Sequence, residues 1–244
     1  MGLLALLLSA APAGAQERLI RVLEPIAAKL EPDQKVVYKT VGDRSLHLHV
    51  FTPENESEGP NACLLLIHGG GWTGGEPRRL YPIADHYAKR GVVAISLEYR
   101  LLHRENSHSV FDCVKDGRSA VRFLRGHAEA FKIDPHRIAI YGASAGGHVA
   151  LCTAVLESAP DFDESSDDLS ISCRPDLLLP AYPVIDTSGR GYGQKKIGER
   201  WRAISPLHNL KPELPPMLIL HGTGDKVTPF DGVRQFVKQS RELG

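Results

Sequence analysis

Short apolar runs recur along the chain and are separated by longer amphipathic segments. Residues 62–67 (ACLLLI), 92–97 (VVAISL) and 217–220 (MLIL) are almost entirely apolar. This pattern is typical of parallel strands that are buried on both faces of a sheet. Shorter runs at 138–141 and 177–179 predict two further strands of the same kind. We therefore expect a mostly parallel central sheet.

Helical periodicity fills the gaps between these runs. Between residues 110 and 128, apolar or small residues recur at intervals of three and four, and Ser109 with Asp112 matches the capping box that begins a helix. Residues 81–90 and 231–243 are each followed by a glycine and predict further helices. Strands that alternate with helices predict the α/β fold class, with helices on both faces of the sheet.

The N-terminal part of the chain has a different pattern. Leu46, Leu48 and Val50 alternate with polar residues and follow a Gly-Asp turn. Together with residues 35–38, this segment predicts an antiparallel β-hairpin with one face exposed to solvent. Residues 17–30 have the pattern of a short amphipathic helix.

Length and charge narrow the possible classes of protein. The 244 residues suffice for one large α/β domain and are too few for two. Lys and Arg total 29, Asp and Glu total 29, and the charges are scattered. This balance gives no electrostatic reason to expect nucleic acid or an anionic membrane as a partner. We expect a single domain over residues 16–244, and the sequence leaves its oligomeric state open.

The first residues have the features of a secretory signal peptide. The segment MGLLALLLSAAPAGAQ contains an apolar run too short to span a bilayer and an Ala-Gly-Ala pattern that suits cleavage after Ala15. We therefore expect residues 1–15 to be a signal peptide and the protein to be secreted or periplasmic. The alternative is a buried N-terminal helix. Asn55-Glu56-Ser57 matches the N-glycosylation pattern.

Cysteines and acidic residues form no recognisable metal-binding pattern. The cysteines at 63, 113, 152 and 173 include no C-x-x-C pair, and the sequence has no H-E-x-x-H. Export would permit a disulfide, for instance between Cys113 and Cys152, but the spacing assigns none. Residues 158–174 are rich in aspartate without the spacing of a calcium loop, so we expect a solvated acidic loop. No metal or other cofactor is implied.

The segment RIAIYGASAGGHVALCTAVL, residues 137–156, predicts a strand, a sharp turn and a helix in that order. Its G-x-S-x-G turn contains Ser144, and the flanking glycines lack the Cβ atoms that would keep strand and helix apart. The hydroxyl group then stands clear of the backbone. The N–H of Ala145 lies near the helix N-terminus, where it can stabilise an oxyanion. These residues predict a nucleophile, and an ordinary glycine-rich turn is the alternative.

A second motif, HGGGW, begins at His68 directly after the apolar run at 62–67. Glycines allow such a loop to turn its N–H groups toward a ligand oxygen. Together the two motifs resemble the α/β-hydrolase family, and within it the hormone-sensitive-lipase-like carboxylesterases with acetyl- and feruloyl-esterase-like members.

This resemblance covers residues 62–227 and implies roles for individual residues. Gly70 and Gly71 would donate hydrogen bonds to the oxyanion alongside Ala145, and His68 would brace their loop. Trp72 would form a wall of the substrate pocket, with simple packing as an equal alternative.

The resemblance also implies a triad acid after a later strand. The run at 217–220 leads into His-Gly-Thr-Gly-Asp, so Asp225 is the expected acid, Asp186 the reserve candidate, and a local turn the alternative role. The family places the triad histidine after the acid, but none of the 19 residues after Asp225 is a histidine. We reject His221 because it is too close to Asp225, and His148 because it shares a helix with Ser144. We therefore expect a C-terminally incomplete α/β-hydrolase without the last strand and helix of its sheet.

The two motifs predict a serine nucleophile with an oxyanion site, and the resemblance implies a serine carboxylesterase that hydrolyses short-chain or carbohydrate-linked esters through an acyl-enzyme. The alternatives are an arylformamidase or peptidase-type hydrolase on the same fold, or a catalytically inactive binding domain. A small-molecule or carbohydrate ester is the expected partner, with no nucleic acid and no membrane. The glycine-rich basic segment at 188–201 is expected to form part of a lid or pocket rim.

Overall fold

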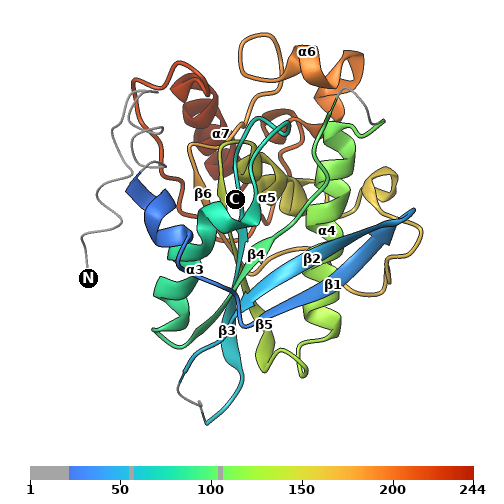
Figure 1. Ribbon diagram of the computed structural model, residues 1–244. Coiled ribbons are helices and arrows are strands. Elements are labelled where there is room, and N and C mark those ends of the chain that lie inside the picture. Colours follow the sequence, from blue (N-terminus) through green and yellow to red (C-terminus); the bar gives the residue numbers. More distant parts are fainter. Residues whose placement is uncertain (1–21, 55–57, 104–106) are drawn as a thin grey trace.

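A six-stranded sheet forms the centre of the protein (Figure 1). The computed structural model describes residues 22–54, 58–103 and 107–244. The predicted signal peptide and the Asn55 glycosylation pattern lie outside these residues and stay predictions. In chain order the strands are β1 (Gln34–Val41), β2 (Arg44–Phe51), β3 (Asn61–Ile67), β4 (Val92–Leu97), β5 (Ile133–Ala143) and β6 (Leu177–Ala181).

The spatial order of the strands is β1-β2-β4-β3-β5-β6. Strand β1 pairs antiparallel with β2, as the hairpin pattern predicted, and β2 pairs antiparallel with β4. The pairs β3–β4, β3–β5 and β5–β6 are parallel. The carboxyl ends of β3, β5 and β6 therefore meet at one edge of the sheet, where α/β proteins bind their ligands.

The predicted strand at 217–220 lies beside β6 but forms only two isolated parallel bridges, Leu178 to Met217 and Ala181 to Leu220. The Leu178 N–H donates to the Pro216 carbonyl, directly before this segment, and the Tyr182 N–H donates to the Leu220 carbonyl. Pro180 lies between them and has no N–H to donate, so the ladder is interrupted at that point.

Helices cover both faces of the sheet, as the alternating pattern predicted (Figure 1). On one face, α3 packs on Leu64 and Leu66 of β3. On the other face, Leu65 belongs to the larger core shared with α4, α5 and α7. The helices are α3 (Tyr81–Ala88), α4 (Val110–Gly126), α5 (Ala145–Val155), α6 (Gln194–Ile197) and α7 (Phe230–Leu243), with 3-10 turns at Pro77–Leu80, Pro160–Phe162, Glu199–Ile204 and Pro206–His208.

The start of α4 tests the predicted capping box. Helix α4 begins after Ser109, whose N–H donates to the Asp112 carboxylate at 2.7 Å, so the predicted capping box is confirmed. It ends at Gly126, and the chain then turns into a strand that begins at Ile133, five residues earlier than its apolar run indicated. At the N-terminal end of the described chain, residues 22–27 are helical.

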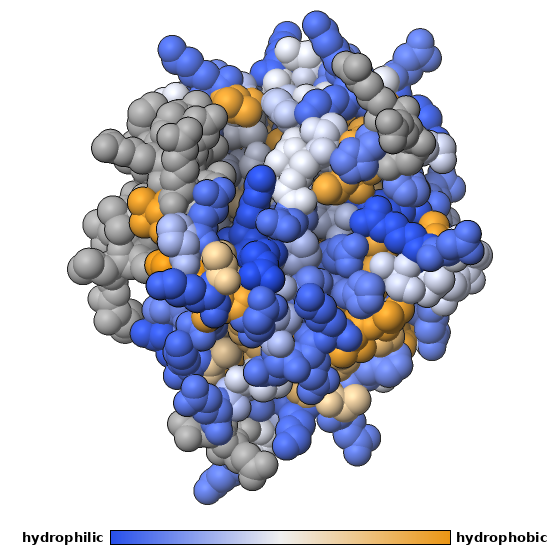
Figure 2. Space-filling model, viewed as in Figure 1, coloured by the Kyte–Doolittle hydropathy of each residue, from blue (hydrophilic) through white to orange (hydrophobic). Residues whose placement is uncertain are grey.

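Three further facts concern the surface, the helices and the cysteines. The face shown in Figure 2 is mostly hydrophilic, with hydrophobic side chains in separate patches. None of the helices in the described part of the chain is both long and apolar enough to cross a membrane. All four cysteines are buried free thiols, so the disulfide that export would permit between Cys113 and Cys152 is not formed.

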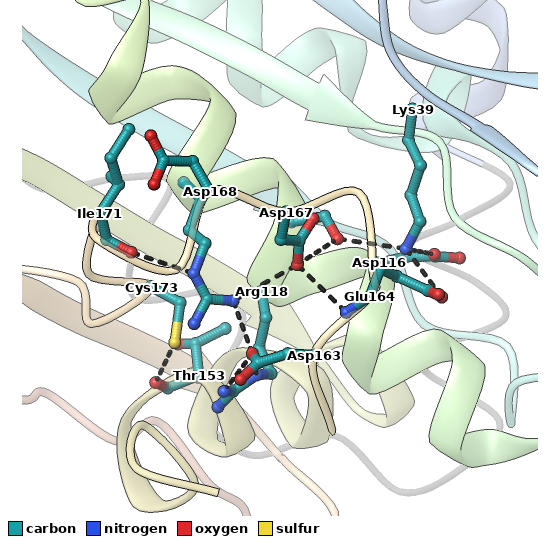
Figure 3. A network of polar contacts seen from close by, with 12 residues as sticks. Lys39, Asp116, Arg118, Thr153, Asp163, Glu164, Asp167, Asp168, Ile171 and Cys173 are labelled. Carbon is teal, nitrogen blue, oxygen red and sulfur yellow. Dashed lines mark hydrogen bonds and ion pairs between the residues drawn. The ribbon is translucent and has the colours of Figure 1, made fainter. Parts of the chain in front are cut away.

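The prediction of a solvated acidic loop at 158–174 is wrong for its central residues (Figure 3). The Asp163 carboxylate accepts from Arg118 at 2.5 Å and from Arg122 at 2.7 Å, and its side chain is only 10% exposed. Both arginines project from α4 one turn apart and are buried. The sequence shows the acidic residues of this loop close together, but their partners lie about forty residues away on a helix. The loop is therefore an ion-paired cover over α4.

A second set of buried charges lies next to this cover. The Asp116 carboxylate, fully buried on α4, binds Lys39 of β1 at 2.7 Å and the Arg100 guanidinium at 2.7 Å. It also accepts the backbone N–H of Arg100 at 2.8 Å. Glu164 of the acidic loop binds the same two cations, at 3.1 Å and 2.5 Å. Two carboxylates and two cations thus join the hairpin, the helix, the loop after β4 and the acidic cover.

Replacing Asp116 with alanine is expected to destabilise the fold by about 3–5 kcal/mol, because Lys39 and Arg100 would lose a buried counter-charge. Urea unfolding at neutral pH measures this loss. Asp85→Ala is the matched control, since Asp85 forms an exposed pair with Lys89 on one helix, and such a pair contributes at most about 1 kcal/mol. Equal losses in the two variants would contradict the role given to the buried carboxylate.

Acid is expected to weaken the cover through Glu164. Burial raises the pKa of this carboxyl, but Lys39 and Arg100 more than offset the effect, so its pKa lies below the ordinary value of 4.5. A depressed folded-state pKa contributes stability above the unfolded pKa, and this stability is lost as the pH falls through the folded value. Glu164→Gln should therefore cost stability at pH 7 and cost progressively less below about pH 4.5. Urea unfolding across this range would contradict the account if the difference stayed constant.

Candidate active site

Ser144 lies at a sharp turn between β5 and α5. Its backbone has φ 53° and ψ −117°, a conformation that L-residues rarely adopt and that a surrounding structure must enforce. The Ser144 N–H donates to the Ala181 carbonyl at 2.9 Å, and its own carbonyl accepts from His148 at 3.1 Å and Val184 at 3.2 Å. The side chain is half-buried. The turn predicted from G-x-S-x-G is confirmed, and three backbone hydrogen bonds hold it.

Glycines on both motifs allow the turn and the HGGG loop to touch. A Cβ atom on Gly146 would lie 2.5 Å from the His68 carbonyl oxygen. A Cβ atom on Gly69 would lie 2.8 Å from the Ala143 carbonyl oxygen and 3.2 Å from the Ser144 Cβ. These spacings leave no room for a larger residue on either side. The two loops therefore contact each other main chain to main chain, next to the serine.

The HGGG loop has the backbone that its glycines predict. Gly70 has φ 126° and Gly71 has φ 60°, both in the region that favours glycine. The Gly70 carbonyl accepts from Thr73 and Gly74, each at 3.1 Å, which closes the loop on itself. The amides of Gly70 and Gly71 thus lie on the loop that abuts the Ser144 turn, and the amide of Ala145 opens α5.

His68 lies at the base of this loop and is buried. Its Nδ1 is 2.8 Å from the Gly69 carbonyl oxygen, and its own carbonyl accepts from the Tyr99 hydroxyl at 2.8 Å. Burial lowers the pKa of its imidazole to about 4, so the ring is neutral at pH 7. These contacts are those of a residue that supports the loop, which is the role that the family resemblance implied.

Trp72 also has a positive φ, 64°, and its side chain is fully buried. Its ring meets the His148 ring edge-on at 5.1 Å and tilts against the Tyr192 ring at 5.5 Å. The indole therefore packs in the core beneath the HGGG loop. Contact between this ring and a substrate stays a prediction.

The Asp225 carboxylate is held by its own loop. Oδ1 accepts the N–H groups of Val227 at 2.8 Å and Thr228 at 2.9 Å, and Oδ2 accepts the Thr228 hydroxyl at 3.0 Å. The Thr228 hydroxyl also lies 3.3 Å from the Tyr182 carbonyl oxygen. The segment from Tyr182 to Val184 is the same one that bonds to the Ser144 turn. Asp225 and Ser144 are thus tied to opposite ends of one short segment after β6.

Asp186, the reserve acid, lies four residues beyond Tyr182 and accepts the Ser188 N–H at 2.8 Å. Its Oδ1 is 3.9 Å from His208 Nδ1, and His208 Nδ1 is also 2.8 Å from the buried Ser205 hydroxyl. Asp186 and His208 line a cavity of about 640 Å³, together with Tyr192, Trp201 and Thr228. Val184, whose N–H donates to the Ser144 carbonyl, also lines this cavity. No sequence pattern singles out His208, because only the folded chain brings it to Asp186.

The two rejected histidines have other partners. His148 is fully buried, its Nε2 is 2.7 Å from the Ile204 carbonyl oxygen, and burial lowers its pKa to about 4. His221 Nδ1 is 3.0 Å from the Gly222 carbonyl oxygen. Within the described chain, neither ring is hydrogen-bonded to Ser144 or Asp225. The part of the chain that the structure describes also contains no cluster of three or more histidine, cysteine or acidic side chains that could hold a metal ion.

The basic segment at 188–201 was predicted to form part of a lid or pocket rim. In the structure it covers the HGGG loop. Lys196 of α6 donates from Nζ to the Gly71 carbonyl at 3.0 Å. A Cβ atom on Gly193 would lie 2.6 Å from the Trp72 ring. No local sequence pattern could reveal the contact between Lys196 and Gly71, because these residues lie 125 positions apart in the chain.

Comparison with known proteins identifies the family of this chain. Residues 48–189 match the family model BD-FAE. The chain is 26% identical over 230 residues to the probable carboxylic ester hydrolase LipM of Mycobacterium tuberculosis, an alignment that covers 86% of this chain and 52% of LipM. The chain therefore spans about half the length of the relatives that it matches by sequence.

The solved structures that are similar to this chain include esterases. A propionate-bound esterase from the planctomycete Thermogutta terrifontis is similar at a TM-score of 0.78 and 34% identity, over 86% of this chain and 79% of that one. Esterase 2 of the same organism, phosphorylated by paraoxon, is similar at a TM-score of 0.78 and 33% identity, over 86% and 78% of the two chains. The family match spans more than half of the chain and includes both glycine-rich motifs. This chain is therefore a member of the BD-FAE family of α/β-hydrolase esterases.

Proposed function

We propose that this protein is a serine carboxylesterase that cleaves short-chain or carbohydrate-linked carboxylic esters through an acyl-enzyme. The observation that supports the proposal is the contact between the strained Ser144 turn and the HGGG loop, because main-chain N–H groups next to a serine hydroxyl can stabilise an oxyanion. The family membership and the esterase relatives support the same activity. The signal-peptide pattern at the N-terminus supports export.

The reaction assigns a role to each group. Ser144 Oγ attacks the ester carbonyl carbon, and the carbonyl π electrons move to oxygen, which becomes the oxyanion. The N–H groups of Gly70, Gly71 and Ala145 donate hydrogen bonds to it, and such donors stabilise the charge that develops in the transition state. Collapse of the tetrahedral intermediate expels the alcohol and leaves an acyl-serine, which water then hydrolyses.

A base must accept the Ser144 proton and pass it to the departing alcohol. In the family this base is a histidine held by the carboxylate that we assign to Asp225. The loop of Asp225 fixes its two oxygens through Val227 and Thr228. Residues 226–244 contain no histidine, and we assign no residue of this chain to the role of base. Trp72 remains the proposed substrate-contacting residue beneath the loop.

Added imidazole is expected to reveal the nucleophile. Loss of the base costs a serine hydrolase about 10⁶ in kcat, and free imidazole can accept the serine proton in its place. Hydrolysis of p-nitrophenyl acetate by this chain should therefore rise with imidazole concentration beyond the reaction of imidazole alone. Ser144→Ala should abolish the increment. An increment that survives Ser144→Ala would reject the serine mechanism, and no increment in either protein would favour a binding domain without activity.

The strain at Ser144 gives an independent test. Glycine adopts φ 53° and ψ −117° at much lower cost than serine, so Ser144→Gly should raise the free energy of unfolding by about 1 kcal/mol although it removes the proposed nucleophile. Ser144→Ala is the control, because it removes the same hydroxyl and keeps the strain. Urea unfolding measures both variants. Equal stability of the glycine and alanine variants would show that the turn is not strained.

A further inference from the structure

Residues 191–198 lie directly on the loop that we assign as the oxyanion donor. Lys196 Nζ donates to the Gly71 carbonyl oxygen at 3.0 Å. A Cβ atom on Gly71 would lie 2.6 Å from the Tyr192 hydroxyl and 2.9 Å from Lys196 Nζ. The ammonium group therefore sits against the same residue whose N–H is a proposed oxyanion donor.

Tyr192 fixes the position of this ammonium group. Its hydroxyl lies 2.9 Å from Lys196 Nζ, and Lys196 Nζ lies 5.1 Å from the centre of its ring. The Tyr192 ring rests in turn on the buried Trp72 at 5.5 Å. A flexible lysine side chain is thus held at its end by a carbonyl oxygen, a hydroxyl group and an aromatic face.

The held ammonium group retains a donor for a ligand. A lysine ammonium has three N–H donors, and the two contacts with Gly71 and Tyr192 use two of them. Within the described residues, no carboxylate forms an ion pair with Lys196. The side chain is exposed, so its third donor is open to solvent at the edge of the site.

The surrounding segment adds positive charge. Between residues 188 and 202 the chain has five basic side chains and one acidic one, although the whole protein has no net charge. A local excess of one sign beside a site raises the concentration of oppositely charged ligands there. The charge of the segment and the open donor of Lys196 both favour an anionic group at this edge.

We propose that Lys196 is a specificity-determining residue that selects esters whose acyl part carries a carboxylate. Its third N–H binds the carboxylate of the substrate, while the ester carbonyl of the same molecule occupies the position between Ser144 and the amides of Gly70 and Gly71. Tyr192 acts as a positioning residue for the ammonium group. This inference rests on the proposed function, because it places the ester carbonyl at Ser144.

A pair of matched esters tests the proposal by binding alone. Monomethyl succinate and methyl butyrate differ in that a carboxylate replaces the terminal methyl group of the acyl chain. Ser144→Ala prevents turnover, so each ester can be titrated intact. The chain has two tryptophans, so Trp201→Phe assigns the indole N–H signal of Trp72. The Tyr192 ring, which holds Lys196, rests on Trp72, so this signal reports on binding at Lys196 in an NMR titration.

Monomethyl succinate should bind about three- to fivefold more tightly than methyl butyrate, the range expected for an exposed ion pair. Lys196→Met on the same background should remove the preference, Lys196→Arg should keep its sign, and high salt should reduce it. Lys195→Met is the matched control, because Lys195 is the adjacent exposed lysine and, among the described residues, forms no hydrogen bond with the HGGG loop. This control should keep the preference.

Equal affinities for the two esters, an unchanged preference in Lys196→Met, or no binding of either ester would overturn the inference. The proposed function is tested separately by the dependence of hydrolysis on Ser144. Serine-dependent hydrolysis without the carboxylate preference would reject only the role of Lys196. A preference lost in Lys196→Met, without serine-dependent hydrolysis, would reject only the esterase activity.

Discussion

The structure of the site depends on the direct contact of two main-chain segments. The turn at Ser144 and the HGGG loop approach so closely that Gly146 faces the carbonyl of His68 and Gly69 faces the carbonyl of Ala143. Any side chain at these glycines would push the two segments apart. Small residues therefore allow the Ser144 turn to lie against the HGGG loop, and N–H groups at such a position can stabilise an oxyanion.

The sheet brings these segments together and buried polar groups keep them in place. In the parallel pairing of β3 and β5, Ile67 lies opposite Gly142, so the HGGG loop and the Ser144 turn leave the sheet side by side. Tyr99 holds the HGGG loop through the His68 carbonyl. The next residue, Arg100, is fixed by Asp116. Glu164 of the acidic loop also binds Arg100, so the ion-paired cover of α4 is linked through two consecutive residues to the base of the proposed oxyanion loop.

Sequence patterns predicted those features that depend on neighbours along the chain. Apolar runs located the strands, the capping box located the start of α4, and G-x-S-x-G located the strained turn. Features that depend on distant partners were not predicted. Asp163 looks solvated in the sequence, because Arg118 and Arg122 reach it only in the folded chain. The run at 217–220 pairs with β6 but lacks a continuous ladder, because Pro180 has no N–H to donate.

The central claim is that Ser144 presents its oxygen to the amides of the HGGG loop. The most direct test is a crystal structure of the protein after reaction with paraoxon in the presence of imidazole, which can accept the serine proton. Paraoxon phosphorylates the similar Thermogutta terrifontis esterase 2. The account predicts a phosphoryl group on Ser144 Oγ, with its P=O oxygen about 3 Å from the N–H groups of Gly70, Gly71 and Ala145. A phosphoryl oxygen that points into solvent, or a phosphoryl group on another residue, would contradict it.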